Sequence, residues 1–362
     1  MKLEPHTTLP TSGARCVCLF NINNEIYVDL PQLAEDIDGA VANMNGGNSE
    51  THASIYQWKN DDFRLFQTLS VHGGEHIDFA IINNIPMLAI ANIRGGSQPH
   101  YSTDVSTEIF SFKDKFFSLS QSIPSFAAKS TCFFSIADKH FLGISEGVLE
   151  SEADNGRTSS NNIYKWDTDQ FHHYQALPST WGYDMSHFKF GGNHYLSVAD
   201  NINSSKIYIW QEGKFEQLQE FANKGGGRGF CYFQIGEHHY IAFANLLHQS
   251  FLYRWNGNQF EEVQAFDGAG ARSFHFVQLN GENYLFRVNF ITGTRDAPIT
   301  KQTSQVYKWQ NDKFEVNAEF VTYGGTDCKT FTHNNSHYLV VSNSLAEDTR
   351  FRTDSIIYKL HL

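Results

Sequence analysis

The chain has 362 residues, with 27 lysines and arginines against 39 aspartates and glutamates, so its formal net charge is −12. This balance excludes a nucleic-acid binder that works by neutralising phosphates, because such a protein needs clustered excess Lys and Arg. Apolar residues make up 41% of the chain and aromatic residues 15%, which suffices for a large core and excludes a disordered acidic chain.

The beginning of the chain, MKLEPHTTLP, has no apolar segment like that of a secretory signal. No stretch approaches the roughly eighteen apolar residues of a membrane-spanning helix. We therefore expect a soluble protein without membrane insertion, cytoplasmic as the chain stands. The cysteines are odd in number, lie far apart and form no CxxC pair, so neither a zinc site nor a disulfide framework is expected. They are Cys16, Cys18, Cys132, Cys231 and Cys328.

A five-residue string recurs along the chain and marks one strand of a repeat. Its seven copies close on Trp, Phe or Leu, and consecutive copies lie 44 to 54 residues apart. That period is typical of four short strands with their turns, whereas no heptad or helical period occurs. In chain order the copies are SIYQW (54–58), EIFSF (108–112), NIYKW (162–166), KIYIW (206–210), FLYRW (251–255), QVYKW (305–309) and IIYKL (356–360).

A second motif, F-x-x-x-Q, follows every string except the last, although its sixth copy has Ala318 in place of Gln. A Gly-rich turn and an alternating stretch such as 271–279 come next, then a short Asn/Gly turn and a further apolar strand. Period-two alternation between such turns indicates β-strands. The five complete copies run from Phe63 to Gln67, Phe117 to Gln121, Phe171 to Gln175, Phe215 to Gln219 and Phe260 to Gln264.

Seven such units predict an all-β fold, a seven-bladed β-propeller of four-stranded blades, which protects its sheet edges by closing into a ring. The seventh unit lacks a fourth strand, whereas residues 3–9 match the register of the fourth strand at 260–266. We therefore expect the N-terminal strand to complete the last blade of a single, monomeric domain. The alternative is a disordered tail. The predicted blades cover about 14–69, 74–123, 128–177, 182–221, 227–266, 271–320, and 325–362 together with 1–9.

With the IYxW string, the F-x-x-x-Q motif and the Gly-Ala turn in place, the chain resembles the epilepsy-associated repeat family, also called EPTP repeats. The resemblance covers essentially the whole chain. It implies a propeller that recognises proteins at the extracellular surface and performs no catalysis. The chain carries no adhesion partner domain, and it keeps the family's Asp after the Gly-Ala turn only at Asp184 and Asp327.

One position of the repeat, at the entry to the first strand of each unit, is rich in basic residues. The first strands of a propeller line its central channel, so we expect these side chains to converge on the channel mouth. Arg and Lys there predict a ligand with a carboxylate or phosphate group. The alternative is that the cations pair with nearby carboxylates such as Glu75, Asp184 and Asp327. In blade order the position reads Arg15, Glu75, Lys129, Tyr183, Arg228, Arg272 and Thr326.

Carboxylates along the same strands form a second candidate site. Asp184 and Asp327 occupy the family's Asp position, and Asp78 lies two residues further along its strand. Carboxylates that converge on an axis can hold a hard cation such as Ca²⁺. The family resemblance also implies calcium in the channel, and the sequence indicates no other cofactor.

Five of the seven connections between second and third strands are long, and they belong to the face that carries the channel mouth. We interpret them as a wall that leaves blades 4 and 5 open, although long surface loops are also tolerated without a ligand. They span 30–54, 92–108, 145–162, 289–305 and 342–355. Their acidic residues favour cations or basic partners: Asp36, Asp38, Glu50, Asp104, Glu146, Glu150, Glu152, Asp154, Glu347 and Asp348.

We predict a binding module that presents this loop-walled face to a protein or glycan, because no catalytic motif is recognised. The alternative is a small-molecule enzyme or anion-binding protein that uses the channel mouth. Its acid–base residues would be His76, Tyr183 or His275. A pair of Cys18 or Cys231 with His275 is geometrically possible, but the sequence shows nothing that lowers a thiol pKa. The ligand-binding residues of this alternative are Arg15, Lys129, Tyr183, Arg228 and Arg272.

Overall fold

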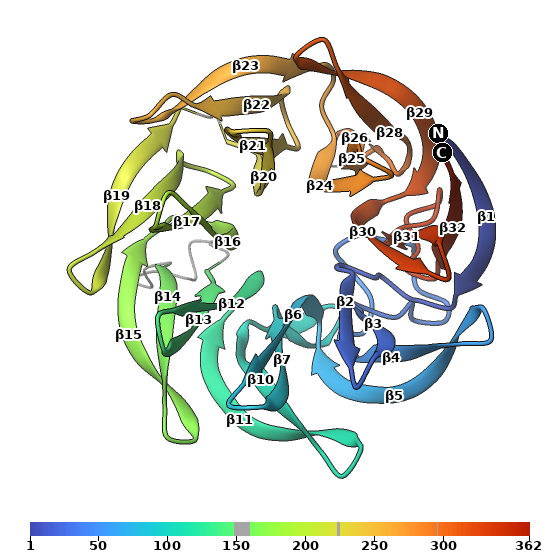
Figure 1. Cartoon of the computed structure of the whole chain (residues 1–362). Helices are drawn as coiled ribbons and strands as arrows, with labels where there is room; N and C mark the ends of the chain where they lie inside the picture. The colour runs from blue at the N-terminus through green and yellow to red at the C-terminus, as the bar shows by residue number, and fades with distance from the viewer. Residues whose placement is uncertain (148–159, 223–224, 295) are drawn as a thin grey trace.

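The computed structural model describes residues 1–147, 160–222, 225–294 and 296–362. These residues form seven four-stranded antiparallel sheets, arranged as blades around a central axis (Figure 1). The first strand of each blade lies next to the axis and the last strand lies at the rim. The predicted seven-bladed β-propeller is confirmed. Within the described ranges, no helix has the length and apolar character needed to cross a membrane.

The blades follow one another in chain order, and their strands are given from the axis to the rim. Blade 1 contains β2 (Cys18–Ile22), β3 (Glu25–Pro31), β4 (Glu50–Lys59) and β5 (Asp62–His72). Blade 2 contains β6 (Gly74–Ile82), β7 (Ile85–Asn92), β10 (Asp104–Lys113) and β11 (Phe116–Phe126). Blade 3 contains β12 (Ser130–Ile136), β13 (Lys139–Ser145), β14 (Ser160–Asp167) and β15 (Gln170–Pro178). Blade 4 contains β16 (Gly182–Phe190), β17 (Asn193–Asp200), β18 (Ser205–Gln211) and β19 (Lys214–Phe221).

The remaining blades repeat this arrangement. Blade 5 contains β20 (Gly227–Ile235), β21 (His238–Asn245), β22 (Ser250–Trp255) and β23 (Phe260–Phe266). Blade 6 contains β24 (Ala271–Leu279), β25 (Glu282–Asn289), β28 (Lys301–Gln310) and β29 (Lys313–Tyr323). Blade 7 contains β30 (Gly325–His333), β31 (Ser336–Asn343), β32 (Ser355–His361) and β1 (Lys2–Leu9). Two small hairpins lie within loops: β8 (Gly95–Ser97) with β9 (His100–Ser102), and β26 (Thr292–Gly293) with β27 (Pro298–Ile299).

A β-bulge recurs where the third strand pairs with the fourth, at the centre of the repeated string. In blade 1, Ile55 faces Gln67 and Tyr56 faces Leu65, so Phe66 is an extra residue in β5. The same register shift occurs in each of the other blades, including between Pro5 and Thr7 of β1. A bulge bends its strand and re-aims the neighbouring side chains. The motif glutamine therefore follows directly after a bend in the rim strand.

That glutamine clamps one blade to the next. In blade 1, Gln67 Nε2 donates a hydrogen bond to the Phe117 carbonyl oxygen (2.7 Å), and Gln67 Oε1 accepts one from the Phe117 amide (2.9 Å). Both partners belong to the motif phenylalanine of blade 2. The same two bonds join Gln121 to Phe171, Gln175 to Phe215, Gln219 to Phe260 and Gln264 to Phe314. Blade 7 lies outside this series, since Ala318 and Thr7 occupy the glutamine position at its two interfaces.

Aromatic residues fill the space between blades, which explains why the chain is rich in them. Rings from the first strands of neighbouring blades stack, as in Phe20 with Phe79 at 4.5 Å between ring centroids and Phe233 with Phe276 at 4.3 Å. The Trp that closes the string packs edge-on against the motif Phe of its own blade. These pairs, with centroids 4.9 to 5.1 Å apart, are Trp58–Phe63, Trp166–Phe171, Trp210–Phe215, Trp255–Phe260 and Trp309–Phe314.

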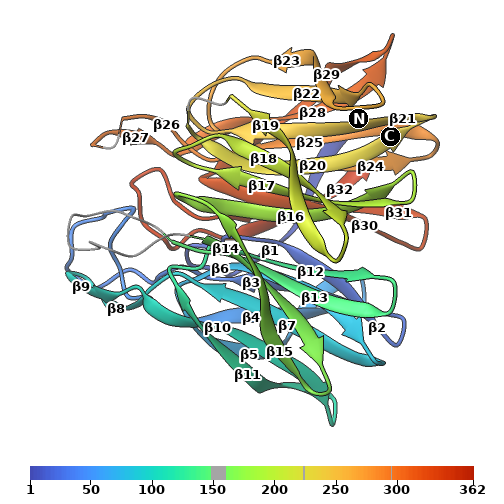
Figure 2. The same ribbon diagram turned by 90° about the vertical axis from the view of Figure 1, so that its left-hand side faces the viewer.

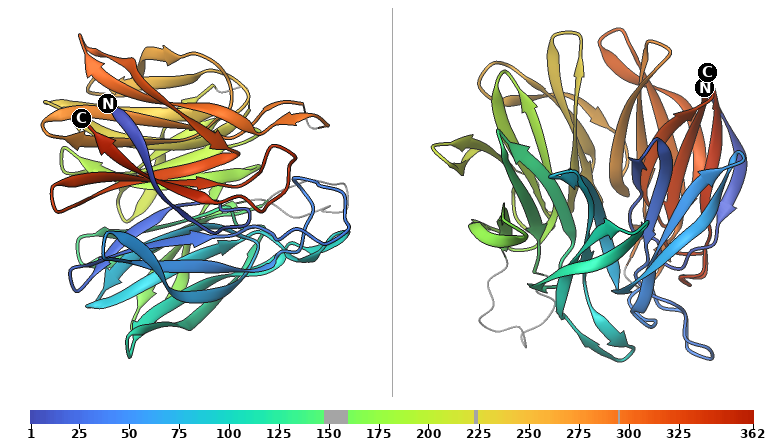
Figure 3. Two further views of the ribbon diagram at one scale, coloured as in Figure 1. Left: turned by 90° about the vertical axis from the view of Figure 1, so that its right-hand side faces the viewer. Right: turned by 60° about the horizontal axis from the view of Figure 1, so that its bottom comes forward.

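The ring is closed by the N-terminal strand, as predicted. β1 pairs with β32 from Lys2 opposite His361 to Leu9 opposite Ser355. Leu9 is buried at 2% exposure, so the pairing also contributes to the core. The two termini lie side by side at the rim (Figure 1). They lie toward the face opposite the long loops (Figure 3).

Candidate functional site

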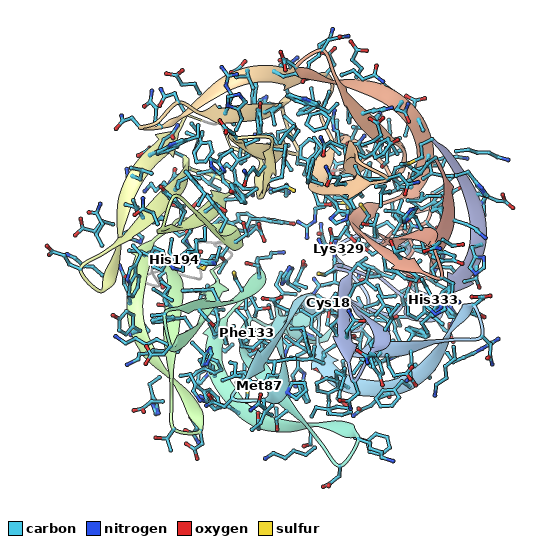
Figure 4. All side chains as sticks on the ribbon, viewed as in Figure 1. Cys18, Met87, Phe133, His194, Lys329 and His333 are labelled. Carbon is cyan, nitrogen blue, oxygen red and sulfur yellow. The ribbon has the colours of Figure 1, made fainter. Side chains whose placement is uncertain are left out.

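The first strands of all seven blades, with the residues that precede them, line a central cavity of about 420 Å³. Figure 4 shows side chains of these strands reaching into the centre of the ring, Lys329 and Cys18 among them. We call the seven residues at its loop-side end the mouth ring. They are the predicted residues Arg15, Glu75, Lys129, Tyr183, Arg228, Arg272 and Thr326, and the structure brings them together as lining residues or as direct partners of lining residues.

Local backbone geometry places most of the mouth ring. In blade 2 the pairing of β6 with β7 shifts between Gly74 and His76, so Glu75 is the extra residue of a β-bulge. The corresponding bulges of blades 4 to 7 have Tyr183, Arg228, Arg272 and Thr326 as their extra residues. Because a bulge re-aims a side chain, these residues leave the alternation of their strands and gather at the mouth.

Glu75 is the shared counter-ion of three cations. One carboxylate oxygen lies 3.1 Å from Lys129 Nζ and 3.6 Å from Arg15 Nε, and the other lies 3.5 Å from Arg272 Nη2. All four side chains are at least nine-tenths buried. Burial alone would raise the pKa of Glu75, but the three positive charges outweigh burial and lower this pKa to about 2. The predicted pairing of mouth cations with carboxylates therefore holds for Glu75.

Tyr183 lies among the cations rather than beside a carboxylate. The guanidinium carbons of Arg228 and Arg272 lie 4.1 and 4.4 Å from the centroid of its ring, and Lys129 Nζ lies 5.2 Å away. Burial would raise the pKa of Tyr183, but the charges of Arg272, Arg228 and Lys129 outweigh it and hold this pKa below its ordinary value. Burial also lowers the pKa of Arg228 to about 10. Thr326, the last residue of the mouth ring, is uncharged, and its hydroxyl donates a hydrogen bond to the Ala14 carbonyl oxygen (2.9 Å).

The three aspartates proposed as metal ligands line the cavity but do not form a ligand set. Asp78 Oδ1 and Oδ2 accept hydrogen bonds from the amides of Phe79 (2.9 Å) and Phe133 (2.6 Å). Asp327 forms an ion pair with Lys329 at 3.3 Å. Burial raises the pKa of Asp184, which favours its neutral form. Among the described residues, no three His, Cys, Asp or Glu side chains are placed to hold a metal ion, so the residues present do not fit the calcium site that the family resemblance implies.

The candidate acid–base residues are engaged in contacts between blades. His76 Nδ1 accepts a hydrogen bond from the Thr131 amide (3.3 Å), and His275 Nε2 accepts one from the Thr330 amide (3.2 Å). Burial, together with the charge of Lys329, lowers the pKa of His275 to about 3. Burial raises the pKa of the Cys231 thiol to about 11. A thiolate activated by His275 is therefore disfavoured.

The long connections of blades 1, 2, 6 and 7 stand on the face that carries the mouth, where Figure 2 shows them projecting to one side. The strand bounds confirm the five long connections, but the acidic residues Glu150, Glu152 and Asp154 of the third lie outside the described residues. We call the connections 32–49, 93–103 and 344–354, from blades 1, 2 and 7, the loop wall. Its base is an apolar cluster whose buried members, including one from blade 6, are Leu33, Ala34, Phe290, Leu345 and Phe351.

The loop wall is cross-braced by hydrogen bonds. The Asp36 carboxylate accepts from the amides of Phe351 (3.1 Å) and Arg352 (3.0 Å), which joins blade 1 to blade 7. The Arg94 guanidinium donates to the two carbonyl oxygens of residues 45–46, at 2.7 Å each, and lies 3.9 Å from the centroid of the Tyr101 ring. These contacts join blade 2 to blade 1. These contacts therefore hold the loop wall in a defined conformation.

Blades 4 and 5 leave an open side as predicted, and it faces the loop wall across the mouth, with blades 3 and 6 between them. The connections of blades 4 and 5, 201–204 and 246–249, are short. Each presents an exposed apolar side chain, Ile202 at 46% and Leu247 at 58% exposure. A surface cavity of about 530 Å³ lies next to the second connection, which contributes His248 and Gln249 to its lining, between the rim strand of blade 4 and the third strand of blade 5. Phe221 and Tyr253 contribute to its lining.

Comparison with known families agrees with this geometry. The model of the EPTP domain matches residues 170–211, 214–256, 259–310 and 313–361, together just over half of the chain. The chain belongs to the EPTP family. Each matched EPTP repeat begins at the rim strand of one blade and ends after the third strand of the next. An EPTP repeat is therefore offset from a blade by one strand and contributes to two blades.

Curated relatives of this EPTP propeller carry additional modules in their names. The chain is 27% identical over 177 residues to the thrombospondin-type laminin G domain and EAR repeat-containing protein of Mus musculus, which covers 47% of the chain and 26% of the relative. It is 22% identical over 205 residues to leucine-rich repeat LGI family member 2 of Homo sapiens. This match covers 56% of the chain and 32% of the relative. These matches span about a quarter to a third of each relative.

A solved structure supports the fold alone. A protein named as a 6-phosphogluconolactonase from Bacteroides uniformis superposes with a TM-score of 0.56 at 13% sequence identity. The match covers 85% of each chain. At this identity the likeness is one of propeller architecture and carries no activity to the EPTP propeller.

Sequence reasoning missed the residues that act through contacts between distant segments. Lys329 neutralises Asp327, and Asp36 and Arg94 hold the loop wall together. The sequence marks Asp36 only as one of several acidic loop residues, and it does not single out Lys329 or Arg94. The clamping role of the motif glutamine was also missed. Its recurrence at one position of five repeats was the available signal, because a polar residue kept at one place in an apolar repeat needs a hydrogen-bond partner.

Proposed function

We propose that this EPTP propeller is a protein-interaction module whose partner docks on the loop face, over the open side of blades 4 and 5 and against the loop wall. Membership of the EPTP family supports an interaction role over catalysis. The relatives combine these repeats with leucine-rich repeats or a laminin G domain, as their names state, so the repeats serve there as one module among several.

The observation that carries the proposal is the contrast between the two halves of the loop face. One half bears a braced wall on an apolar base, and the other exposes Ile202 and Leu247 and has a cavity of about 530 Å³ next to the connection that carries Leu247. Interfaces between proteins place apolar side chains at the centre and polar groups at the rim. A partner that covers Ile202 and Leu247 and extends across the mouth would meet the loop wall with its far edge.

The charge of the wall indicates the chemistry of the partner. Asp38, Glu347 and Asp348 are exposed on it. Lys301 and Arg350 pair with the latter two at 2.9 and 3.4 Å, so their negative charge is partly balanced. We infer a partner surface with an apolar centre and a basic margin, because complementary charge steers association and fixes orientation.

The test is retention of a partner by the immobilised full chain. The wild type is compared with the double variant Ile202→Asp/Leu247→Asp and with the control Leu119→Asp, which alters an equally exposed leucine on rim strand β11 (55% exposed). We expect the wild type and the control to retain the same protein from a cell-surface extract, and the double variant to retain at least tenfold less, because burying a charge in an apolar contact is costly.

Two outcomes would contradict the proposal. Equal retention by the double variant, with its fold confirmed by circular dichroism, would show that the open side is not the docking surface. A retained ligand that survives protease digestion of the extract but disappears after glycosidase treatment would identify a glycan as the partner.

A further inference from the structure

We propose that the mouth ring is a binding site for a small oxyanion, held by the guanidinium groups of Arg15, Arg228 and Arg272 beside the ring of Tyr183. The ligand would be a free phosphate, sulfate or carboxylate that enters the central cavity. The proposal is independent of the protein partner on the open side.

Charge is out of balance at the mouth. Four cations, Arg15, Lys129, Arg228 and Arg272, face the single carboxylate of Glu75, which is shared by three of them. Arg228 has no carboxylate partner among the described residues and donates instead to the neutral oxygens of Asn201 and Gly227. Buried charges are ordinarily paired or bound to a counter-ion, because their removal from water is costly.

The aspartates along the channel do not supply the missing charge. They lie one to three residues further along the inner strands. Asp327 is committed to Lys329, and the oxygens of Asp78 accept backbone amides. Asp184 is close enough to interact with Arg272, so two carboxylates at most, Glu75 and Asp184, face the four cations. The positive excess therefore remains at the mouth.

Hydrogen-bond donors are also left over. Arg228 Nε and Arg272 Nη1 are buried and form no hydrogen bond within the described residues, and Arg15 Nε, also without a hydrogen bond, has only the Glu75 carboxylate nearby at 3.6 Å. Arg15 is 9% exposed and Arg272 8% exposed, so water reaches neither group freely. Nearly all buried donors in proteins have an acceptor, and an unpaired one indicates an unseen partner. An oxyanion offers several lone pairs at one point and can accept from all three guanidinium groups.

The site is preorganised around Tyr183. Two guanidinium carbons lie within 4.4 Å of the centroid of one aromatic ring, which holds two like charges close together. The charge of Arg272 acts on Arg228, so an anion that contacts both groups would offset this repulsion. The cavity of about 420 Å³ accommodates a small molecule, since ligand pockets typically measure a few hundred cubic ångströms.

The first test is thermal unfolding of the full chain with phosphate, sulfate, acetate or succinate at constant ionic strength, with chloride as the reference salt. We expect a saturable rise in Tm with at least one oxyanion, because a ligand that binds only the folded state stabilises it. The variant Arg228→Gln/Arg272→Gln should weaken this response roughly 100-fold, since each lost charged donor costs about tenfold or more. The control Arg64→Gln, which removes an exposed arginine from β5, should respond like the wild type.

A second measurement needs no arginine variant and covers the case in which the double variant does not fold. In an alkaline titration followed by tyrosinate absorption, Tyr183 should lose its proton at a higher pH when the oxyanion is bound, because the bound negative charge raises the pKa of a nearby phenol. Tyr183→Phe should remove this change. If no oxyanion raises Tm or alters the tyrosinate signal, or if both responses persist at full strength in the arginine variant, the proposal is wrong.

The same data separate this proposal from the protein-interaction proposal. Ile202→Asp/Leu247→Asp should keep the full oxyanion response, because these residues are not part of the mouth ring. Loss of partner retention in that variant with an intact oxyanion response supports both proposals. An absent oxyanion response in the wild type with an intact partner overturns only the anion site.

Discussion

Two buried carboxylates in this molecule have opposite pKa shifts, and the difference lies in their neighbours. Glu75 touches three cations, which lower its pKa to about 2. Asp29, fully buried in β3, has no such neighbour, and burial raises its pKa to about 7. In the other six blades, the second-strand residue at the position of Asp29 is Ala, Gly, Ser, Phe or Val. Asp29 is thus an acidic residue at a repeat position that is uncharged in the other six blades.

We expect Asp29 to make the protein less stable as the pH rises. An unfolded Asp loses its proton near pH 4, whereas the folded protein keeps it up to about pH 7. The unfolded state therefore binds fewer protons between these values, and the free energy of unfolding falls with pH across that window. A pKa shift of this size lowers the free energy of unfolding by at most about 4 kcal/mol across that window.

Asp29→Asn should remove this dependence. Relative to the wild type, we expect the variant to gain about 1–4 kcal/mol at pH 8 and nearly nothing at pH 4, measured by urea unfolding. The control Asp38→Asn alters an exposed carboxylate and should change neither value. An equal difference between wild type and Asp29→Asn at both pH values would contradict the shifted pKa.

Calcium removal gives a second prediction at this scale. Because Asp78 and Asp327 are already satisfied by backbone amides and by Lys329, we expect EGTA to leave Tm unchanged. The measurement is thermal unfolding of protein purified without chelator, with and without EGTA. A fall of several degrees, reversed by added Ca²⁺ but not by Mg²⁺, would show that the channel carboxylates rearrange around a cation.

Among the repeated elements, the bulge and the glutamine after it join neighbouring blades. The bulge bends the rim strand, and the glutamine then binds the backbone of the next blade through two hydrogen bonds. A single blade has no closed core of its own. Contacts of this kind between neighbours therefore hold the blades together, as in other repeat proteins.

Gln219→Ala should lower the free energy of unfolding by about 1–3 kcal/mol, because it leaves the Phe260 amide and carbonyl without their partner. The control is Gln217→Ala on the same strand, whose side chain is exposed and whose loss should cost under about 0.5 kcal/mol. Both are measured by chemical denaturation. Similar values for the two variants would show that the clamp adds no stability.

The sequence was informative about elements and weak about contacts. Seven recurrences of one string define the strands, and alignment of the repeats places Arg15, Tyr183 and Arg272 at one mouth. No repeat tells which of these side chains meet, so the sharing of Glu75 by three cations follows only from the folded geometry. The bracing of residues 351–352 by Asp36 joins segments 315 residues apart and belongs to non-repeating loops.

For the whole molecule, the offset of the EPTP repeat explains how the ring closes. From β1 to β32 the strands form seven units, each a rim strand followed by three strands of the next blade. The first unit therefore supplies the rim strand that the last blade lacks. β1 closes the ring by pairing with β32 in blade 7, whereas the glutamine clamp is absent from both interfaces of that blade.

Deleting residues 1–9 should destabilise the whole propeller, because β32 becomes an exposed edge and the buried Leu9 is lost. We expect a lower Tm and concentration-dependent association, measured by circular dichroism and size-exclusion chromatography. Leu9→Ala alone should cost about 2–5 kcal/mol, whereas Thr8→Ala, at an exposed position of the same strand, should cost far less. A truncated chain that melts like the full one would show that closure is dispensable.

The adjacent termini behind the propeller have a practical and a biological consequence. A polypeptide joined to either end leaves from the rim of blade 7 on the side away from the long loops (Figures 1 and 3). Attached in this way to a surface, a membrane anchor or another module, the propeller would turn its loop face outward. Fusion at both ends at once would leave that face equally accessible, so the molecule is suited to display one surface while tethered by the other.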